Sequence, residues 1–176
     1  MDYYRLILSD SIKNKLLLTA LDTKCYKSNI SDEEFEKLPE GIVTFYKYQS
    51  DIEITDILME PSLMVSPKLK KVLQMYNNEI EAKSVKAFPV QKEINLSPEY
   101  WVLHIPELDC LNREAVKINP NGTVQELILN RNDIGEADVF KVKGTLENFV
   151  IVSLAVVESI LRRKMYGVGF REVKVK

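Results

Sequence analysis

The sequence predicts an α+β fold: a single domain over residues 1–176, with a mixed or mainly antiparallel sheet and two to four helices. Three observations predict it. The length of 176 residues is close to the common size of one domain. Apolar residues make up 45% of the chain and charged residues 28%, which is ordinary for a protein with a packed core. Strand patterns do not alternate regularly with helix patterns, which argues against a doubly wound parallel sheet.

The N-terminal third is predicted to hold two strands and one short helix. Residues 3–8 are rich in aromatic and branched side chains, as an opening strand would be. Residues 11–21 fit a helix or a strand equally well. Ser31 followed by Glu34 is the capping-box pattern that starts a helix. A strand is expected at 41–48.

The clearest helix is predicted to start at Ser66 and Pro67. A serine at this position accepts backbone N–H bonds as N-cap, and proline suits the first helical position. Apolar residues then recur at i, i+3, i+4 and i+7, which places them on one helix face. These residues are Leu69, Val72, Leu73 and Tyr76.

The remaining strands are predicted from branched and aromatic runs between turn residues. A Pro-Asn-Gly turn at 120–122 precedes one of them, and Gly144 marks the turn of a hairpin. The predicted strands lie at 85–90, 100–105, 124–130, 139–142, 148–152 and 170–175.

The last helix is predicted to begin after Ser153, whose side chain can serve as its cap. Its basic end, at 162–164, suits the negative end of the helix dipole. The stripe expected to be buried comprises Leu154, Val157, Ile160 and Leu161.

Composition limits the classes of function. A net charge of −2 argues against nucleic acid as the partner, since that affinity depends on clustered Lys and Arg. Cys25 and Cys110 are too few for a disulfide scaffold or a four-thiolate zinc site. The first residues lack the pattern of a secretory signal, and the longest apolar runs fall short of the ~20 residues of a membrane span. We therefore expect a cytoplasmic protein with no membrane segment.

A catalytic centre has few residues available to build it. His104 is the only histidine, which excludes a metal site made of several histidines. A small hydrolase or transferase could use His104 with Cys110 or with a carboxylate. However, His104 lies in a strand pattern, and no phosphate-binding glycine loop or G-x-S-x-G motif occurs. The sequence therefore favours a structural histidine and predicts no cofactor and no metal.

Acidic side chains are concentrated in one region. Residues 31–65 hold nine acidic and two basic side chains. Such a run is ordinarily a solvated face, but it can also steer a basic protein partner. The candidate contact residues are Asp32, Glu33, Glu34, Glu36, Asp51, Glu53 and Asp56.

Several segments in order resemble a known family. A capped helix at 63–73 is followed by strand patterns and a turn aspartate, and then by a second group ending in Gly-Val-Gly-Phe. This order resembles the small bacterial immunity proteins that accompany polymorphic toxins. The resemblance covers roughly residues 60–175, and residues 1–60 carry no recognised match. The segments are 63–73, 85–90, 100–105, 108–111, 139–142, 151–153, 158–162 and 167–170.

The resemblance implies a cytoplasmic protein that binds and neutralises a cognate toxin without catalysis. It transfers no catalytic residues. Two other hypotheses stay open at this point: the small hydrolase or transferase centred on His104, and a structural subunit of a larger assembly.

Overall fold

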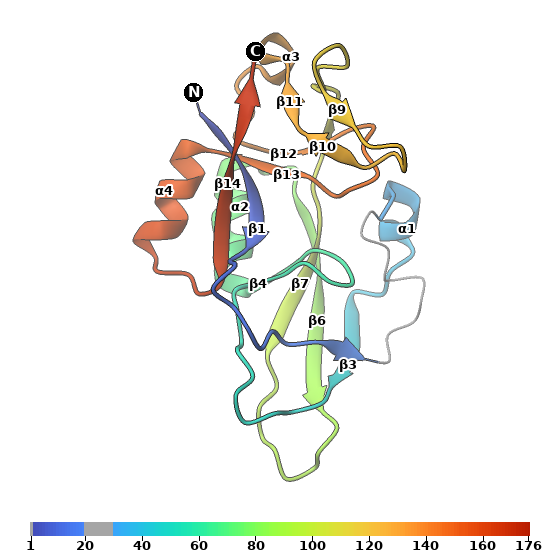
Figure 1. Ribbon diagram of the computed structural model, residues 1–176. Coiled ribbons are helices and arrows are strands. Elements are labelled where there is room, and N and C mark those ends of the chain that lie inside the picture. The colour runs from blue at the N-terminus through green and yellow to red at the C-terminus, as the bar shows by residue number, and fades with distance from the viewer. Residues whose placement is uncertain (1, 20–29) are drawn as a thin grey trace.

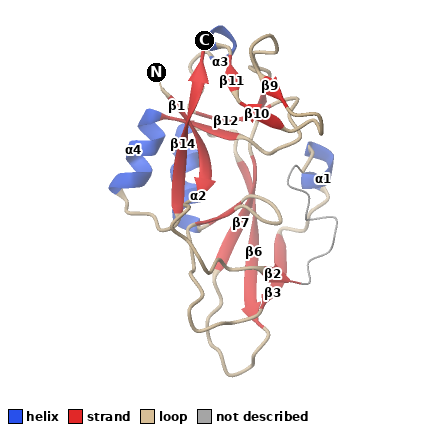
Figure 2. Ribbon diagram, viewed as in Figure 1, coloured by secondary structure: helices blue, strands red, loops and turns tan. Residues whose placement is uncertain are grey.

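The arrangement of strands is the main feature of the computed structural model, which describes residues 2–19 and 30–176. Within these ranges the chain forms four helices and fourteen strands. The strands make two six-stranded sheets and one two-stranded sheet. Figure 2 shows α2 and α4 together on one side of the strands and α1 on the other. The α+β prediction is confirmed, with two large sheets where the sequence suggested one.

The first sheet is built around the N-terminal strand. β1 pairs antiparallel with β13 on one side and with β14 on the other. Figure 1 shows this as the blue and red strands lying side by side. The edge strands β11 and β8 pair in parallel with β14 and β12, so the sheet is mixed. Its order is β11 (Ile128–Leu129), β14 (Val168–Val175), β1 (Tyr3–Leu8), β13 (Val150–Ser153), β12 (Val139–Val142) and β8 (Glu107–Leu108).

The second sheet contains the predicted strands at 41–48, 85–90 and 100–105. β3 and β6 pair in parallel, and every other pair is antiparallel. β6 starts four residues earlier than predicted, because residues 81–84 continue the pairing with β7. Its order is β2 (Leu18–Thr19), β3 (Gly41–Tyr46), β6 (Glu81–Pro89), β7 (Glu99–His104), β5 (Met64–Val65) and β4 (Ile57–Leu58).

One hydrophobic core joins both large sheets. Leu6 and Val152 from the first sheet share a cluster with Val65 and Leu103 from the second. Leu73 of α2 is buried in the same cluster, as are residues of α4. Because apolar burial is the dominant favourable term in folding, this shared core makes the two sheets parts of one domain.

Helix α2 (Pro67–Tyr76) forms as its sequence predicts. The Ser66 hydroxyl accepts a hydrogen bond from the Leu69 backbone N–H at 3.2 Å, and Pro67 occupies the first turn. Leu69, Val72 and Leu73 are buried, and Tyr76 is half-buried against the same core. The predicted apolar face is therefore confirmed.

Helix α4 (Leu154–Arg162) forms where expected but buries a different stripe. Leu154 and Leu161 are exposed, whereas Val156 and Ser159 are buried beside Val157 and Ile160. Apolar residues surround this helix, so periodicity could not choose its inner face. The Ser159 hydroxyl can be buried because Arg163 Nη1 donates a hydrogen bond to it at 2.6 Å.

The cap of α4 also differs from the prediction. Ser153 occupies the N-cap position, but its side chain makes no capping bond to the helix. Its hydroxyl is instead hydrogen-bonded to the Asp138 carboxylate, and its backbone N–H donates to the Asp138 carbonyl at 2.8 Å. The serine therefore joins the start of α4 to the residue preceding β12.

The strand predicted at 124–130 is divided in two. β10 (Val124–Glu126) pairs with β9 (Lys117–Ile118) to form the small sheet, while β11 joins the edge of the first sheet. The interruption falls at Leu127, where the chain passes from one sheet to the other. The predicted hairpin around Gly144 is confirmed by the antiparallel pairing of β12 with β13.

The N-terminal segment that fitted helix or strand is mostly irregular in its described part. Lys15 forms a single bridge to Glu53, and Leu16 is buried. Leu18 and Thr19 form β2. Residues 20 and 21 of this segment, and Cys25, lie outside the described residues. The sequence did not predict helix α3 (Arg131–Ile134). No helix in the described part of the chain has the length and apolar character needed to cross a membrane.

Candidate partner-binding surface

The acidic helix α1 (Asp32–Glu36) begins at the predicted capping box. The Ser31 hydroxyl accepts from the Glu34 backbone N–H at 3.3 Å, and Glu34 Oε2 accepts from the Ser31 backbone N–H at 3.1 Å. The Glu34 carboxylate is thus committed to the helix start. Asp32 and Glu33 also lie in this first turn, where the helix dipole favours negative charge.

Buried groups fix α1 to the second sheet. Phe35 is 3% exposed and packs in the cluster formed by Tyr46, Val85 and Tyr100. Lys83, on β6, donates through Nζ to the carbonyl of Glu36 at 3.1 Å and to that of Leu38 at 2.5 Å. A lysine can stabilise a helix end by bonding its last carbonyls. A five-residue helix, too short to be stable alone, is thereby held in place.

Replacing Lys83 with methionine should lower the free energy of unfolding by roughly 1–3 kcal/mol, because the carbonyls of Glu36 and Leu38 would lose their donor. Lys86→Met is the matched control, since Lys86 lies on the same strand with its side chain exposed. The control should change stability by no more than about 0.5 kcal/mol. Urea denaturation of both variants measures the difference, and equal effects would contradict the anchoring role.

The anchored helix presents its carboxylates to solvent. The side chains of Asp32 and Glu33 are 84% and 87% exposed. Glu40, four residues beyond the end of α1, is 90% exposed. Glu36 is exposed as well. Asp32 Oδ1 lies 3.5 Å from His104 Nε2, and Glu33 pairs loosely with Lys37 at 3.8 Å. The helix is therefore a firmly held, mainly acidic projection.

The other three acidic candidates lie elsewhere. Asp51, Glu53 and Asp56 belong to the loop between β3 and β4, which Figure 1 shows on the side away from α1. The structure therefore does not bring all seven candidates into one face.

Hydrogen bonds within the chain occupy the carboxylates of this loop. Glu53 accepts from the backbone N–H groups of Lys13 and Asn14 and from the Tyr166 hydroxyl. The bond from Asn14 contributes most to lowering the pKa of Glu53 below its ordinary value. Asp51 accepts from the Asn14 side chain at 2.8 Å. Together these bonds connect the segment after β1 with the turn before β14.

Asp56 joins two further elements. One carboxylate oxygen accepts from the Ser66 hydroxyl at the start of α2, and the other accepts from the Tyr166 backbone N–H at 2.7 Å. Gly167, with φ of 77°, follows this turn, and a Cβ there would lie 2.4 Å from the Thr55 side chain. No sequence pattern predicts this junction, because Asp56 and Tyr166 are 110 residues apart.

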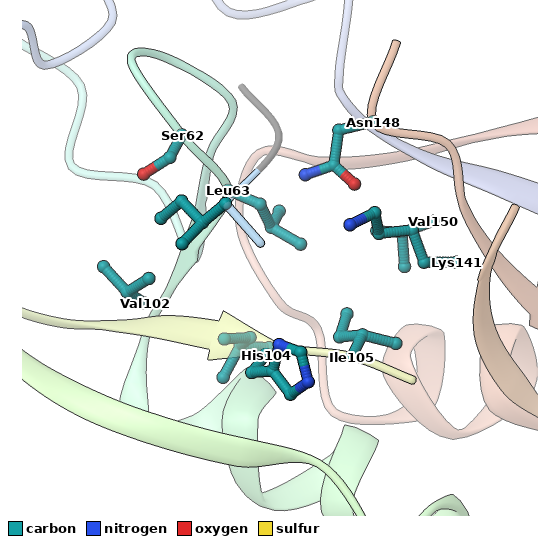
Figure 3. A pocket seen from close by; sticks show the side chains of 10 residues that line it. Ser62, Leu63, Val102, His104, Ile105, Lys141, Asn148 and Val150 are labelled. Atoms are coloured by element: carbon teal, nitrogen blue, oxygen red, sulfur yellow. The ribbon is translucent and has the colours of Figure 1, made fainter. Parts of the chain in front are cut away.

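His104 lines a cavity between the two large sheets. Figure 3 shows Ser62, Asn148, Lys141 and His104 around this space. Its volume of about 20 Å³ is room for about one water molecule, far below the roughly 300 Å³ of a small-molecule pocket. Lys141 forms an ion pair with Glu107 at 2.8 Å.

The hydrolase or transferase hypothesis pairs His104 with Cys110 or with a carboxylate. Cys110 lies apart from His104, whereas the exposed carboxylate of Asp32 lies 3.5 Å from its Nε2. Cys110 is fully buried in a separate apolar cluster with Tyr3 and Phe140, and burial raises the pKa of its thiol to about 11. The Ser62 hydroxyl shares the cavity but has no hydrogen-bond partner among the described residues. His104 instead packs against Phe35, with ring centroids 5.2 Å apart, beside Asp32. No group of three or more potential metal ligands occurs in the described ranges.

Fold and surface together define a small α+β protein that presents a docked acidic helix. A family model described as the immunity protein family Imm11 matches residues 8–175, and the chain belongs to this family. The resemblance seen over residues 60–175 is thus confirmed, and the match extends through most of the N-terminal third. None of the curated proteins compared with the chain matches it.

Proposed function

We propose that this chain is a bacterial immunity protein of a polymorphic toxin system, acting in the cytoplasm to bind and neutralise a cognate toxin without catalysis. The family match over residues 8–175 is the observation that carries the proposal. The buried thiol of Cys110 and the small cavity at His104 support a binding role over the hydrolase hypothesis.

We assign the toxin contact to α1, and within it to Asp32, Glu33 and Glu36. Their exposed carboxylates suit a basic surface, and opposite charge speeds the encounter of two proteins. The helix is already held by Phe35 and Lys83, so binding needs little further ordering of the backbone.

The other candidates receive a positioning role in this proposal. Glu34 holds the start of α1 through its bond to Ser31. Asp51, Glu53 and Asp56 hold loops together on the other side of the molecule. Their carboxylates are partly used by these internal bonds, which leaves less capacity for a partner.

The test is co-expression with the toxin encoded by the neighbouring gene. Bacteria that produce both proteins should grow, and the two should co-purify as a stable complex. Intact mass of the toxin should be unchanged, and dissociation of the complex should restore its activity. Growth arrest despite full expression of this chain, with no complex, would refute the proposal. Protection at amounts far below the toxin, with a changed toxin mass, would indicate an enzyme instead.

A further inference from the structure

Two arginines face each other in the first sheet. Arg5 on β1 and Arg171 on β14 are register partners in an antiparallel pair. Side chains of directly paired residues leave the same face of a sheet, close enough to interact. Like charges at such positions repel each other, so this pairing needs a compensating anion.

The environment of Arg5 makes the repulsion stronger than it would be at a surface. Its guanidinium lies 4.3 Å from the centroid of the Phe149 ring, and its Nε is buried with no hydrogen-bond partner among the described residues. Burial and the nearby charge of Arg171 lower the pKa of Arg5. A buried guanidinium donor ordinarily finds an acceptor, because leaving it unpaired is costly.

The neighbouring carboxylates do not balance both arginines. Glu147 lies near Arg5, but one of its oxygens accepts from the Val124 backbone N–H at 2.8 Å, and the other makes no hydrogen bond to any described residue. Glu126 is held by the ammonium groups of Lys117 and Lys174. Glu147, with one carboxylate oxygen already bonded to Val124, therefore offers one negative charge to two guanidinium groups.

Glu172 also borders this region but cannot serve the pair. It is the register partner of Tyr4, so its side chain leaves the opposite face of the sheet from Arg171. Arg171 itself is exposed and forms no ion pair within the part of the chain that the structure describes.

A cleft lies in front of the two arginines. Its volume is about 280 Å³, near the lower end for small-molecule pockets. Arg5 and Arg171 line it from the first sheet, and Phe149 lines it from the position just before β13. Val124 and Glu126 of β10, and Leu127 just after β10, also line it. The cleft is formed by elements other than α1.

We propose that this cleft binds a small phosphoryl oxyanion, either free phosphate or the phosphate group of a monoester, between Arg5 and Arg171. Guanidinium groups bind phosphate through paired N–H donors, and a tetrahedral anion can accept from two such groups. The aromatic ring of Phe149 and the limited volume of the cleft restrict the ligand to a compact one. This site is independent of the toxin contact assigned to α1.

Thermal unfolding tests the proposal. The Tm in inorganic phosphate is compared with the Tm in sodium chloride of the same ionic strength. Millimolar phosphate should raise the Tm of the wild type, and chloride should not. Phenyl phosphate, as a second ligand, distinguishes free phosphate from a phosphate monoester. A larger rise in Tm with phenyl phosphate than with free phosphate indicates a monoester site. Lys143→Gln, an exposed change elsewhere, should keep the full shift.

The variant Arg171→Gln should change two measured quantities: the Tm without ligand and the rise in Tm caused by phosphate. Without ligand its Tm should rise by about 1–3 °C, because like-charge repulsion is removed. The shift caused by phosphate should disappear. A fall in the ligand-free Tm would mean that Arg171 is structural and would overturn the proposal. So would a phosphate shift that persists in this variant, or the absence of any shift in the wild type.

Discussion

Reversing three charges on α1, in the variant Asp32→Lys, Glu33→Lys and Glu36→Lys, should weaken toxin binding by at least roughly 100-fold. Each reversal replaces an attraction with a repulsion, at roughly 1 kcal/mol per side chain, and about 3 kcal/mol corresponds to this loss. Most of the loss should appear in the association rate, and it should shrink as salt is raised. Surface plasmon resonance at two ionic strengths measures both effects.

The matched control reverses three exposed carboxylates that are not part of α1: Glu93→Lys, Glu114→Lys and Glu136→Lys. It changes the net charge by the same amount, so it separates a local contact from general charge attraction. Its affinity should stay within several-fold of the wild type. If both variants bind equally well, or equally badly, the assignment of the contact to α1 is wrong. The Tm of each variant shows whether the fold is kept.

Replacing Leu73 with alanine should lower the free energy of unfolding by about 2–5 kcal/mol. Leu73 is fully buried on α2, in the cluster that both large sheets share. Truncation removes apolar contacts and leaves a cavity that surrounding strands cannot easily fill. For a chain of this length the Tm should fall by about 4–20 °C.

Met75→Ala on the same helix is the control for this core prediction. The Met75 side chain is 63% exposed, and both substitutions exchange a good helix former for alanine. Its effect should stay below about 1 kcal/mol. Calorimetry of both variants gives the comparison. Similar destabilisation by the two changes would show that helix formation, and not burial of Leu73, controls stability.

The elements that could be predicted are those whose signals are local. Ser66 and Pro67 determine the start of α2, and the capping box of Ser31 and Glu34 determines the start of α1. The strands at 3–8 and 100–105 follow from their own branched and aromatic side chains. Each of these patterns is complete within about ten residues, so no distant partner is needed to recognise it.

What could not be predicted depends on distant partners. The short strands β5 and β8 have two residues each, too few for a period to appear. Their strand geometry comes from pairing with neighbours far along the chain. The inner face of α4 was likewise set by packing, because its apolar residues surround the helix.

The candidate surface also combines features that the sequence predicts with features that depend on distant partners. Charge alone grouped seven acidic residues, but it could not show that Glu53 and Asp56 bind Tyr166, 113 and 110 residues away. Nor could it show that Lys83 would hold the end of α1. The pair formed by Arg5 and Arg171 has no sequence signature, since only strand register places the two side chains together.

The pairing of β1 between β13 and β14 has a consequence for synthesis of the protein. β1 is synthesised long before the strands on both its sides, since Tyr3 pairs with Ser153, 150 residues later, and Leu8 pairs with Val168, 160 residues later. The growing chain must therefore carry β1 without these partners until β13 and β14 have been made, with Tyr3 and Leu6 lacking the residues that later bury them. Contacts between such distant residues also form slowly. Completion of the first sheet should therefore be a late step in folding, because it has to wait until β13 and β14 have been synthesised.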